Sequence, residues 1–205
     1  MKIRLPLISQ KGRPNCGPAS LKMIFSYFGN KISIQDLEKE LGYKEGKGIS
    51  TIRLAITAKK LGYEVLLLTN SIMPRKENFE LDFYKKYSDE DFNGLKLLAD
   101  EAKKLKVTMV EKSISLGKLL SFINKKTIPV VLLDWNIIRN QEKEGFMGHY
   151  VPLVGFDADS VYVNNSGGIK PTRFKKISKS TFDKARKARG TDEDILIISR
   201  KTRQS

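Results

Sequence analysis

Hydrophobic residues in the first half of the chain recur at the spacing of a helix face. Apolar positions three and four residues apart fill segment 16–28, where Pro18 suits the first turn and Gly29 follows the last. Ser33 and Asp36 open a second, shorter repeat in the manner of a helix cap. The pattern predicts helices at 16–28, 33–41, 50–61, 88–105 and 116–124, and Val- or Leu-rich strands at 63–68 and 107–110.

The second half of the chain has the patterning of strands. Segment 71–86, which precedes it, mixes charges with aromatic residues without a clear period, so we interpret it as a loop or flap. Helices followed by strands indicate an α+β fold. The predicted strands lie at 128–133, 149–155, 161–165 and 195–198, with a hairpin turn at 155–160 and a helix at 181–188.

Length and composition narrow the class of protein. The 205 residues are predicted to form one domain, 1–205, because no repeat or linker divides them. No stretch approaches the roughly 20 apolar residues of a membrane helix, and residues 1–10 lack the apolar core of a signal peptide. The single cysteine, Cys16, excludes an internal disulfide and a cysteine zinc site. We therefore expect a cytoplasmic protein without a membrane span, a metal or a cofactor.

The chain is strongly basic, with a formal net charge of +15. Nine Lys or Arg residues lie between Lys170 and Arg189, against Asp183 alone. A solvated Lys-rich surface is the favoured interpretation. A nucleic-acid-binding surface is less favoured, because stacking on bases requires interleaved aromatic residues and this stretch offers only Phe174 and Phe182.

The only cysteine and the only histidine stand where a nucleophile and its base would be placed. Cys16 opens the first predicted helix, where unpaired backbone N–H groups and the helix dipole favour a thiolate. His149 opens a strand directly after the Gly-containing loop 145–148. Nucleophilic catalysis by a thiol needs an imidazole that can take its proton and pass it to the leaving group. The alternatives are a buried, inert cysteine and a structural histidine.

Two further polar residues could complete such a site. The imidazole needs a polar group to orient it, and Asn165 is favoured for this role over its neighbour Asn164, although either can also be a turn residue before Ser166. An oxyanion needs a donor besides the backbone N–H of the nucleophile, and the side-chain amide of Gln10 can supply it.

These motifs resemble the double-glycine, bacteriocin-processing peptidase family of the papain-like clan. The resemblance is carried by Gln10, the run 15–20 (NCGPAS) and residues 148–165, and it covers the first 30 residues and 128–198. It implies a papain-like α+β fold in which N-terminal helices, the first carrying the nucleophile, pack on a C-terminal antiparallel sheet. Residues 71–110 would then be a family-variable insertion. The family usually has Asp where this chain has Asn165, and its better-known members are fused to transporters.

The resemblance implies catalytic roles for Cys16 as nucleophile, His149 as acid and base, Asn165 as orienter and Gln10 as oxyanion donor. The predicted function is hydrolysis of a peptide or isopeptide bond in a peptide or protein substrate, through a thioester on Cys16. The alternatives are acyl transfer on the same fold and an inactive scaffold that binds an acidic partner through 170–189. A nucleic-acid-binding protein ranks last. The sequence does not indicate an oligomeric state.

Overall fold

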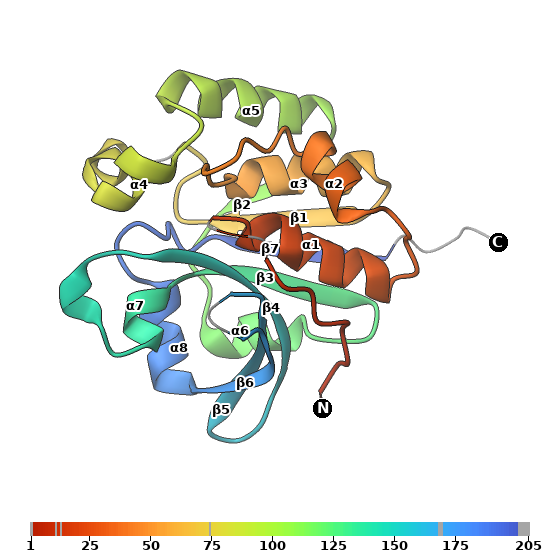
Figure 1. Ribbon diagram of the computed structural model, residues 1–205, viewed down its shortest axis with the longest axis vertical. Helices are drawn as coiled ribbons and strands as arrows, with labels where there is room; N and C mark the ends of the chain where they lie inside the picture. The colour runs from red at the N-terminus through yellow and green to blue at the C-terminus, as the bar shows by residue number, and fades with distance from the viewer. Residues whose placement is uncertain (1, 11, 13, 74, 168–169, 201–205) are drawn as a thin grey trace.

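The computed structural model describes residues 2–200 apart from 11, 13, 74, 168 and 169. Helices dominate the first half, and the second half carries most of the sheet (Figure 1). The helices are α1 (Cys16–Tyr27), α2 (Ile34–Glu40), α3 (Thr51–Lys60), η1 (Lys76–Glu80), α4 (Asp82–Tyr87), α5 (Phe92–Lys104), α6 (Leu116–Ser121), α7 (Trp135–Ile138), η2 (Glu142–Glu144) and α8 (Lys179–Arg186). The strands are β1 (Glu64–Thr69), β2 (Thr108–Glu111), β3 (Thr127–Asp134), β4 (Gly148–Phe156), β5 (Ser160–Asn165), β6 (Thr172–Ser178) and β7 (Ile195–Ser199).

One seven-stranded sheet runs through the described part of the molecule, in the order β2-β1-β7-β3-β4-β5-β6. Only β1 and β2 among these strands pair in parallel; the other neighbours are antiparallel. The last strand, β7, lies between β1 and β3, so the C-terminal segment joins the strand of the helical half to the rest of the sheet. The α+β fold, with N-terminal helices packed on a mostly antiparallel sheet, is therefore confirmed.

Helices cover both faces of the sheet. In Figure 1, α1, α2, α3 and α5 lie above the central strands, and α7 and α8 lie below them. Helix α1 packs on β4, α3 packs on β1, and α8 packs on β3. The central strands β3 and β4 are buried on both faces, as expected for strands that have helices on each side. This packing fixes the N-terminus of α1 against β4, so that Cys16 lies against Tyr150, the residue that follows His149.

Most predicted elements are present, and the differences have local causes. Helix α5 begins at Phe92 rather than 88, because the Asp91 side chain accepts the Gly94 N–H at 2.7 Å and caps the helix there. The turn between β4 and β5 lies within the predicted hairpin turn and is closed by the Ser160 N–H on Asp157 Oδ1 at 2.7 Å. Strand β6 was not predicted, because its sequence is dominated by charges that an edge strand can expose.

Two interpretations of the sequence require correction. Residues 76–87 are not an irregular flap: they form η1 and α4, whose rings contact each other through Phe79 and Tyr84, 6.5 Å apart, while Phe83 of α4 lies 5.2 Å from Phe146. The basic stretch 170–189 is not solvated throughout. Arg186 is fully buried, and it donates to Asp183 and to the carbonyl of Ile114. Within the described residues, no helix is long and apolar enough to cross a membrane.

Candidate active site

Helix α1 begins at the cysteine and points its N-terminus at β4. The Cys16 side chain is buried, with the residue 6% exposed. Its Sγ accepts the backbone N–H of Tyr150 at 3.5 Å, so the thiol lies against the strand at the residue that follows His149. The sequence-predicted nucleophile and base are thus brought to neighbouring positions by the packing of α1 on β4.

The surroundings of the thiol act on its acidity in opposite directions. Burial disfavours the thiolate and raises the pKa of Cys16, which is the largest effect. Backbone N–H groups of Tyr150, Cys16 and Gly17 lower the pKa, as expected at a helix N-terminus. The net shift is upward, so the expected lowering by the helix is present but is outweighed by burial. The sulfur therefore needs a partner that takes its proton.

His149 is held by a side-chain amide at the end of the neighbouring strand. Because β4 and β5 are antiparallel neighbours, the start of β4 lies beside the end of β5. His149 Nε2 and Asn165 Oδ1 are 2.8 Å apart, and both residues are 7% exposed. Asn164 points elsewhere: its Oδ1 accepts the Phe174 N–H at 3.2 Å. Of the two candidates, Asn165 makes the contact that an orienting residue requires.

The Asn165 amide is fixed by the backbone of Gly167. Its Nδ2 donates to the Gly167 carbonyl at 2.9 Å, and the Gly167 N–H donates to Oδ1 at 3.1 Å. Oδ1 is an acceptor only, so in the contact with His149 the proton is on Nε2. The neutral imidazole therefore carries its lone pair on Nδ1, which is the nitrogen that can act as a base.

Gln10 lies beside the same glycine. A Cβ on Gly167 would be 3.0 Å from Gln10 Oε1 and 3.3 Å from His149 Cε1, so both side chains flank this residue. The Gln10 backbone N–H donates to the Ser166 carbonyl at 3.0 Å, and the Ser166 hydroxyl donates to Oε1 at 3.1 Å. One N–H of the Gln10 amide donates to the Gly12 carbonyl at 3.0 Å. The structure thus brings Gln10, His149 and Asn165 together.

Trp135 covers the histidine and was left out of the predicted site. Its ring centroid is 4.5 Å from that of His149, with the planes tilted by 54°. Asp134 caps the short helix that Trp135 opens, and its Oδ1 also accepts the Met147 N–H at 3.1 Å, two residues before His149. The sequence signal was present, since the only tryptophan precedes the loop that leads to His149, but the sequence does not determine the distance between the rings.

A cavity of about 130 Å³ opens on the other side of Cys16. Gly148 and Tyr150 line it, which is expected because alternate residues of β4 face one side and His149 faces the other. Its walls include the N-termini of α1 and α3 and the aromatic residues of η1 and α4. Among the described residues, no three His, Cys, Asp or Glu side chains gather in a way that could hold a metal ion.

Three solved structures that resemble this chain are peptidase domains of the C39 type. A double-glycine-motif protease of an AMS/PCAT transporter, in complex with the leader peptide, has a TM-score of 0.54 at 16% identity and covers 98% of this chain and 94% of its own. The peptidase domain of Streptococcus ComA, a bifunctional ABC transporter, has a TM-score of 0.53 at 16% identity and covers 97% of this chain and 100% of its own. A C39-like peptidase from Bacillus anthracis has a TM-score of 0.61 at 16% identity and covers 99% of this chain and 100% of its own. The fold is therefore that of papain-like C39 peptidase domains.

Sequence comparison identifies the family within that fold. Residues 5–198 match the family model described as guanylylate cyclase. Guanylyl cyclase 1 of Arabidopsis thaliana is 25% identical over 210 residues, which span 95% of this chain and 75% of the relative. The chain belongs to the guanylylate cyclase family. The expected resemblance to double-glycine peptidases is thus confirmed for the fold, whereas the family matched by sequence is a different one.

Proposed function

We propose that this protein is a cysteine peptidase that hydrolyses a peptide or isopeptide bond, with Cys16 as nucleophile and His149 as acid and base. The observation that carries the proposal is the contact between Asn165 Oδ1 and His149 Nε2, which are 2.8 Å apart. Two hydrogen bonds with the backbone of Gly167 hold the Asn165 amide in place. This contact leaves the basic lone pair on Nδ1 in a protein whose buried thiol needs a proton acceptor. A neighbour of similar fold, solved in complex with a leader peptide, supports a peptide as the class of substrate.

The proposed reaction has two halves. His149 Nδ1 takes the Sγ proton as the sulfur attacks the scissile carbonyl carbon, and the carbonyl oxygen becomes an oxyanion. The backbone N–H of Cys16 and the Gln10 amide are the donors for this oxyanion. Collapse of the intermediate breaks the C–N bond, and the proton on His149 goes to the leaving amine. Water then loses a proton to His149 and attacks the thioester, which releases the acid and restores the thiol.

Burial of the thiol shapes the expected pH dependence. Because burial raises the pKa of Cys16, attack at neutral pH depends on proton transfer to His149 rather than on a free thiolate. The Asn165 amide fixes the ring but carries no charge, so it stabilises imidazolium less than a carboxylate would. Asn165 is therefore expected to act mainly by holding the tautomer.

The first experiment measures alkylation of Cys16 by iodoacetamide against pH. The chain has one cysteine and one histidine, so labelling reports this site alone. We expect the wild type to be labelled at neutral pH, and His149→Ala to be labelled only with a midpoint above about 8.5, the ordinary value for a thiol. Asn165→Ala should slow labelling, and Asn164→Ala serves as the control for loss of a buried amide from the same strand. Equal profiles in the wild type and His149→Ala would contradict the proposal.

Cleavage itself is tested with a positional library of fluorogenic peptides. We expect hydrolysis by the wild type and none by Cys16→Ala. Added amines distinguish acyl transfer, because they would be incorporated into the product if the thioester reacts with an amine rather than with water. If the labelling shows no activated thiol and no peptide is cleaved, the inactive scaffold becomes the better account of the fold.

Membership of the guanylylate cyclase family favours a second candidate function, the formation of cyclic GMP from GTP. Cyclisation would join the ribose 3′ oxygen to the α-phosphorus and release pyrophosphate, and it requires no thiol. The test is incubation with GTP and Mg²⁺ or Mn²⁺, followed by measurement of cyclic GMP, in the wild type and Cys16→Ala. Equal formation of cyclic GMP by both, without peptide cleavage, would favour the cyclase over the peptidase.

A further inference from the structure

The cavity beside Cys16 combines apolar walls with acidic groups. Its volume of about 130 Å³ is smaller than the roughly 300–1,000 Å³ that drug-sized ligands occupy, so it suits a single side chain. Rings of η1, α4 and β4 form much of the wall. The carboxylates that line it are those of Glu90, Asp192 and Asp194, and none of the described residues in the lining is Lys or Arg.

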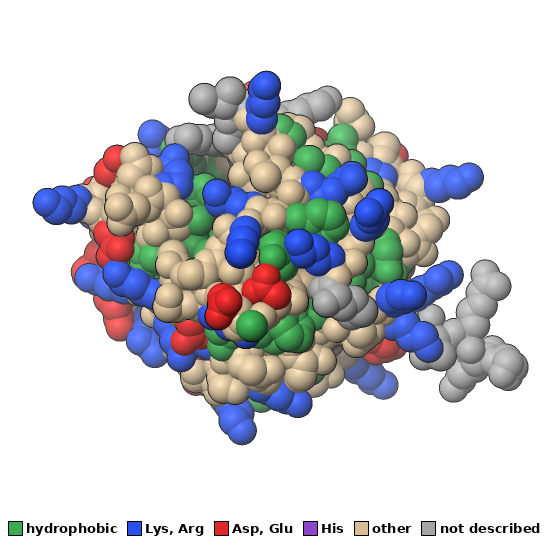
Figure 2. Space-filling view, turned by 90° about the horizontal axis from the view of Figure 1, so that it is seen from below, with side chains coloured by type: hydrophobic (Ala, Val, Ile, Leu, Met, Phe, Trp, Pro, Cys, Tyr) green, Lys and Arg blue, Asp and Glu red, His purple; other side chains and the backbone are tan. Residues whose placement is uncertain are grey.

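This acidic lining contrasts with the rest of the molecule. The chain carries a net charge of +15, and Figure 2 shows Lys and Arg side chains spread over one face, with Asp and Glu side chains in smaller groups among them. A cavity that concentrates negative charge in a basic protein raises the local concentration of cations and disfavours anions. The charge of the cavity therefore indicates the charge of its occupant.

Asp194 is the carboxylate that no cation neutralises in the described part of the chain. Glu90 pairs with Arg53 Nε at 2.5 Å, and Asp192 accepts the Asn78 amide at 2.8 Å with Arg75 Nε at 3.9 Å. Asp194 instead accepts the Thr51 hydroxyl, which also contacts the Tyr150 hydroxyl at 2.8 Å. A carboxylate in a partly buried site without a cationic partner is costly, and a bound cation would offset that cost.

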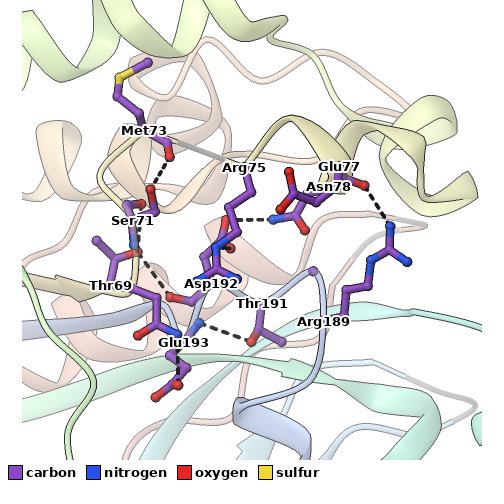
Figure 3. A network of polar contacts seen from close by, with 12 residues as sticks. Thr69, Ser71, Met73, Arg75, Glu77, Asn78, Arg189, Thr191, Asp192 and Glu193 are labelled. Atoms are coloured by element: carbon purple, nitrogen blue, oxygen red, sulfur yellow. Dashed lines mark hydrogen bonds and ion pairs between the residues drawn. The ribbon is translucent and has the colours of Figure 1, made fainter.

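The turn that delivers Asp194 to the cavity is held in an unusual conformation. Asp192 and Glu193 have φ values of 46° and 52°, which non-glycine residues rarely adopt. Hydrogen bonds from Thr69 and Asn70 to the Asp192 carbonyl and from the Asn78 amide to its carboxylate fix the turn (Figure 3). The fold thus sustains local strain at the segment that places both carboxylates in the cavity.

A hydroxyl in the cavity has no hydrogen-bond partner among the described residues. Ser50 precedes α3 and lines the cavity, and its Oγ is buried without a hydrogen-bond partner among the described residues. Buried hydroxyls are usually satisfied. A ligand that brings N–H donors into the cavity would supply partners for this oxygen and for Asp194.

We propose that this cavity is a specificity pocket for a lysine or arginine side chain of the substrate, with Asp194 receiving its charged group. The proposal rests on the proposed peptidase function, because Cys16 lines the same cavity and would cleave near the bound residue. The aliphatic stem of such a side chain packs on the apolar wall, and the aromatic rings of Tyr84 and Phe83 favour a cation. The N–H donors of the charged group satisfy the carboxylate.

The test uses arginine and citrulline, because citrulline has nearly the same shape and no charge. Cys16 lines the cavity, so an occupant should slow its alkylation by iodoacetamide, and this readout requires no peptide cleavage. We expect N-acetyl-arginine amide to protect Cys16 at concentrations about tenfold lower than N-acetyl-citrulline amide. Asp194→Asn should abolish the difference. Asp100→Asn, an exposed change of the same kind on α5, should retain it.

Peptide cleavage separates failure of this inference from failure of the peptidase function. Cleavage of peptides without preference for Arg over citrulline, together with equal protection by both amides, would overturn the pocket and leave the peptidase standing. Arginine-specific protection without cleavage of any peptide would leave the pocket standing and overturn the peptidase. Protection by GTP in place of the arginine amide would overturn the inference and indicate a nucleotide pocket. The comparison of the arginine and citrulline amides uses the wild-type protein, so it does not depend on whether a variant folds.

Discussion

Individual residues of the site have properties that their surroundings impose. Asp194 is the clearest case: its pKa is raised to about 7, mainly by burial and also by the nearby Asp192, although hydroxyls of Thr51 and Thr69 act to lower it. Tyr150 and Tyr84 face the same cavity and have raised pKa values, again mainly through burial, so they stay neutral. At neutral pH, Asp194 is therefore the group of this cluster that changes charge.

The free energy of unfolding should depend on pH because of the Asp194 carboxyl group. Its pKa is about 3.8 in the unfolded chain and about 7 in the folded one, so the native state binds the proton more tightly. The contribution of this group to the free energy of unfolding is fully present below about pH 4. It is lost as the pH rises from there through about 7, and the total loss is roughly 4 kcal/mol. Asp194→Asn removes this loss. Urea titrations of both proteins at pH 5 and pH 8 test it, and an identical pH response in the two would contradict the assignment.

At this scale the sequence indicated the chemistry but not the surroundings. The single cysteine at a helix start, the single histidine at a strand start and an asparagine nearby could be selected from the sequence because catalysis needs those groups. Their catalytic roles remain predictions. Asp194 and Trp135 could not be assigned, because a residue far along the chain joins a site only through packing, and that packing is not encoded in a local pattern.

Among the elements, α4 depends on a glycine in the strand beneath it. A Cβ on Gly148 would lie 2.9 Å from the Phe83 ring and 3.3 Å from the Phe146 ring. Gly148→Ala should therefore displace α4 from the cavity wall at a cost of about 1–3 kcal/mol. Hydrogen exchange of the amides of 82–88 should quicken. Gly117→Ala, in α6, is the matched control, because its new methyl group meets no atom within 4 Å; equal exchange in both variants would contradict the prediction.

Elements with a regular apolar pattern were predictable, and those stabilised by contacts elsewhere were not. Helices α1 and α3 and strands β3 to β5 carry their own hydrophobic periodicity. Strand β6 exists because it pairs with β5, and α4 is accompanied by ring contacts of Phe83 and Tyr84 with Phe146 from a distant part of the chain. A single-sequence pattern contains no information on such partners.

For the molecule as a whole, Arg186 joins α8 to the turn before β7 and to the segment before α6, 72 residues away in sequence. Its fully buried guanidinium pairs with Asp183 of α8 at 2.5 Å and Glu193 before β7 at 3.4 Å, and donates to the Ile114 carbonyl before α6 at 2.9 Å. Arg186→Met should lower the free energy of unfolding by about 1–3 kcal/mol, because the Ile114 carbonyl and two partly buried carboxylates lose a charged hydrogen-bond donor. Arg189→Met, whose side chain is 62% exposed, should change it by less than about 0.5 kcal/mol. Similar midpoints in urea for both variants would contradict this role.

The sequence by itself determined the fold class and the chemical groups of the candidate site, because hydrophobic periodicity and the rarity of Cys and His are properties of the linear chain. The tertiary structure decided which asparagine touches His149, that the thiol is buried enough for its pKa to rise, and that an acidic cavity lies beside it. Burial and distance arise only when α1 packs on β4 and β7 inserts between β1 and β3. Those long-range contacts are set by the whole fold rather than by any one segment.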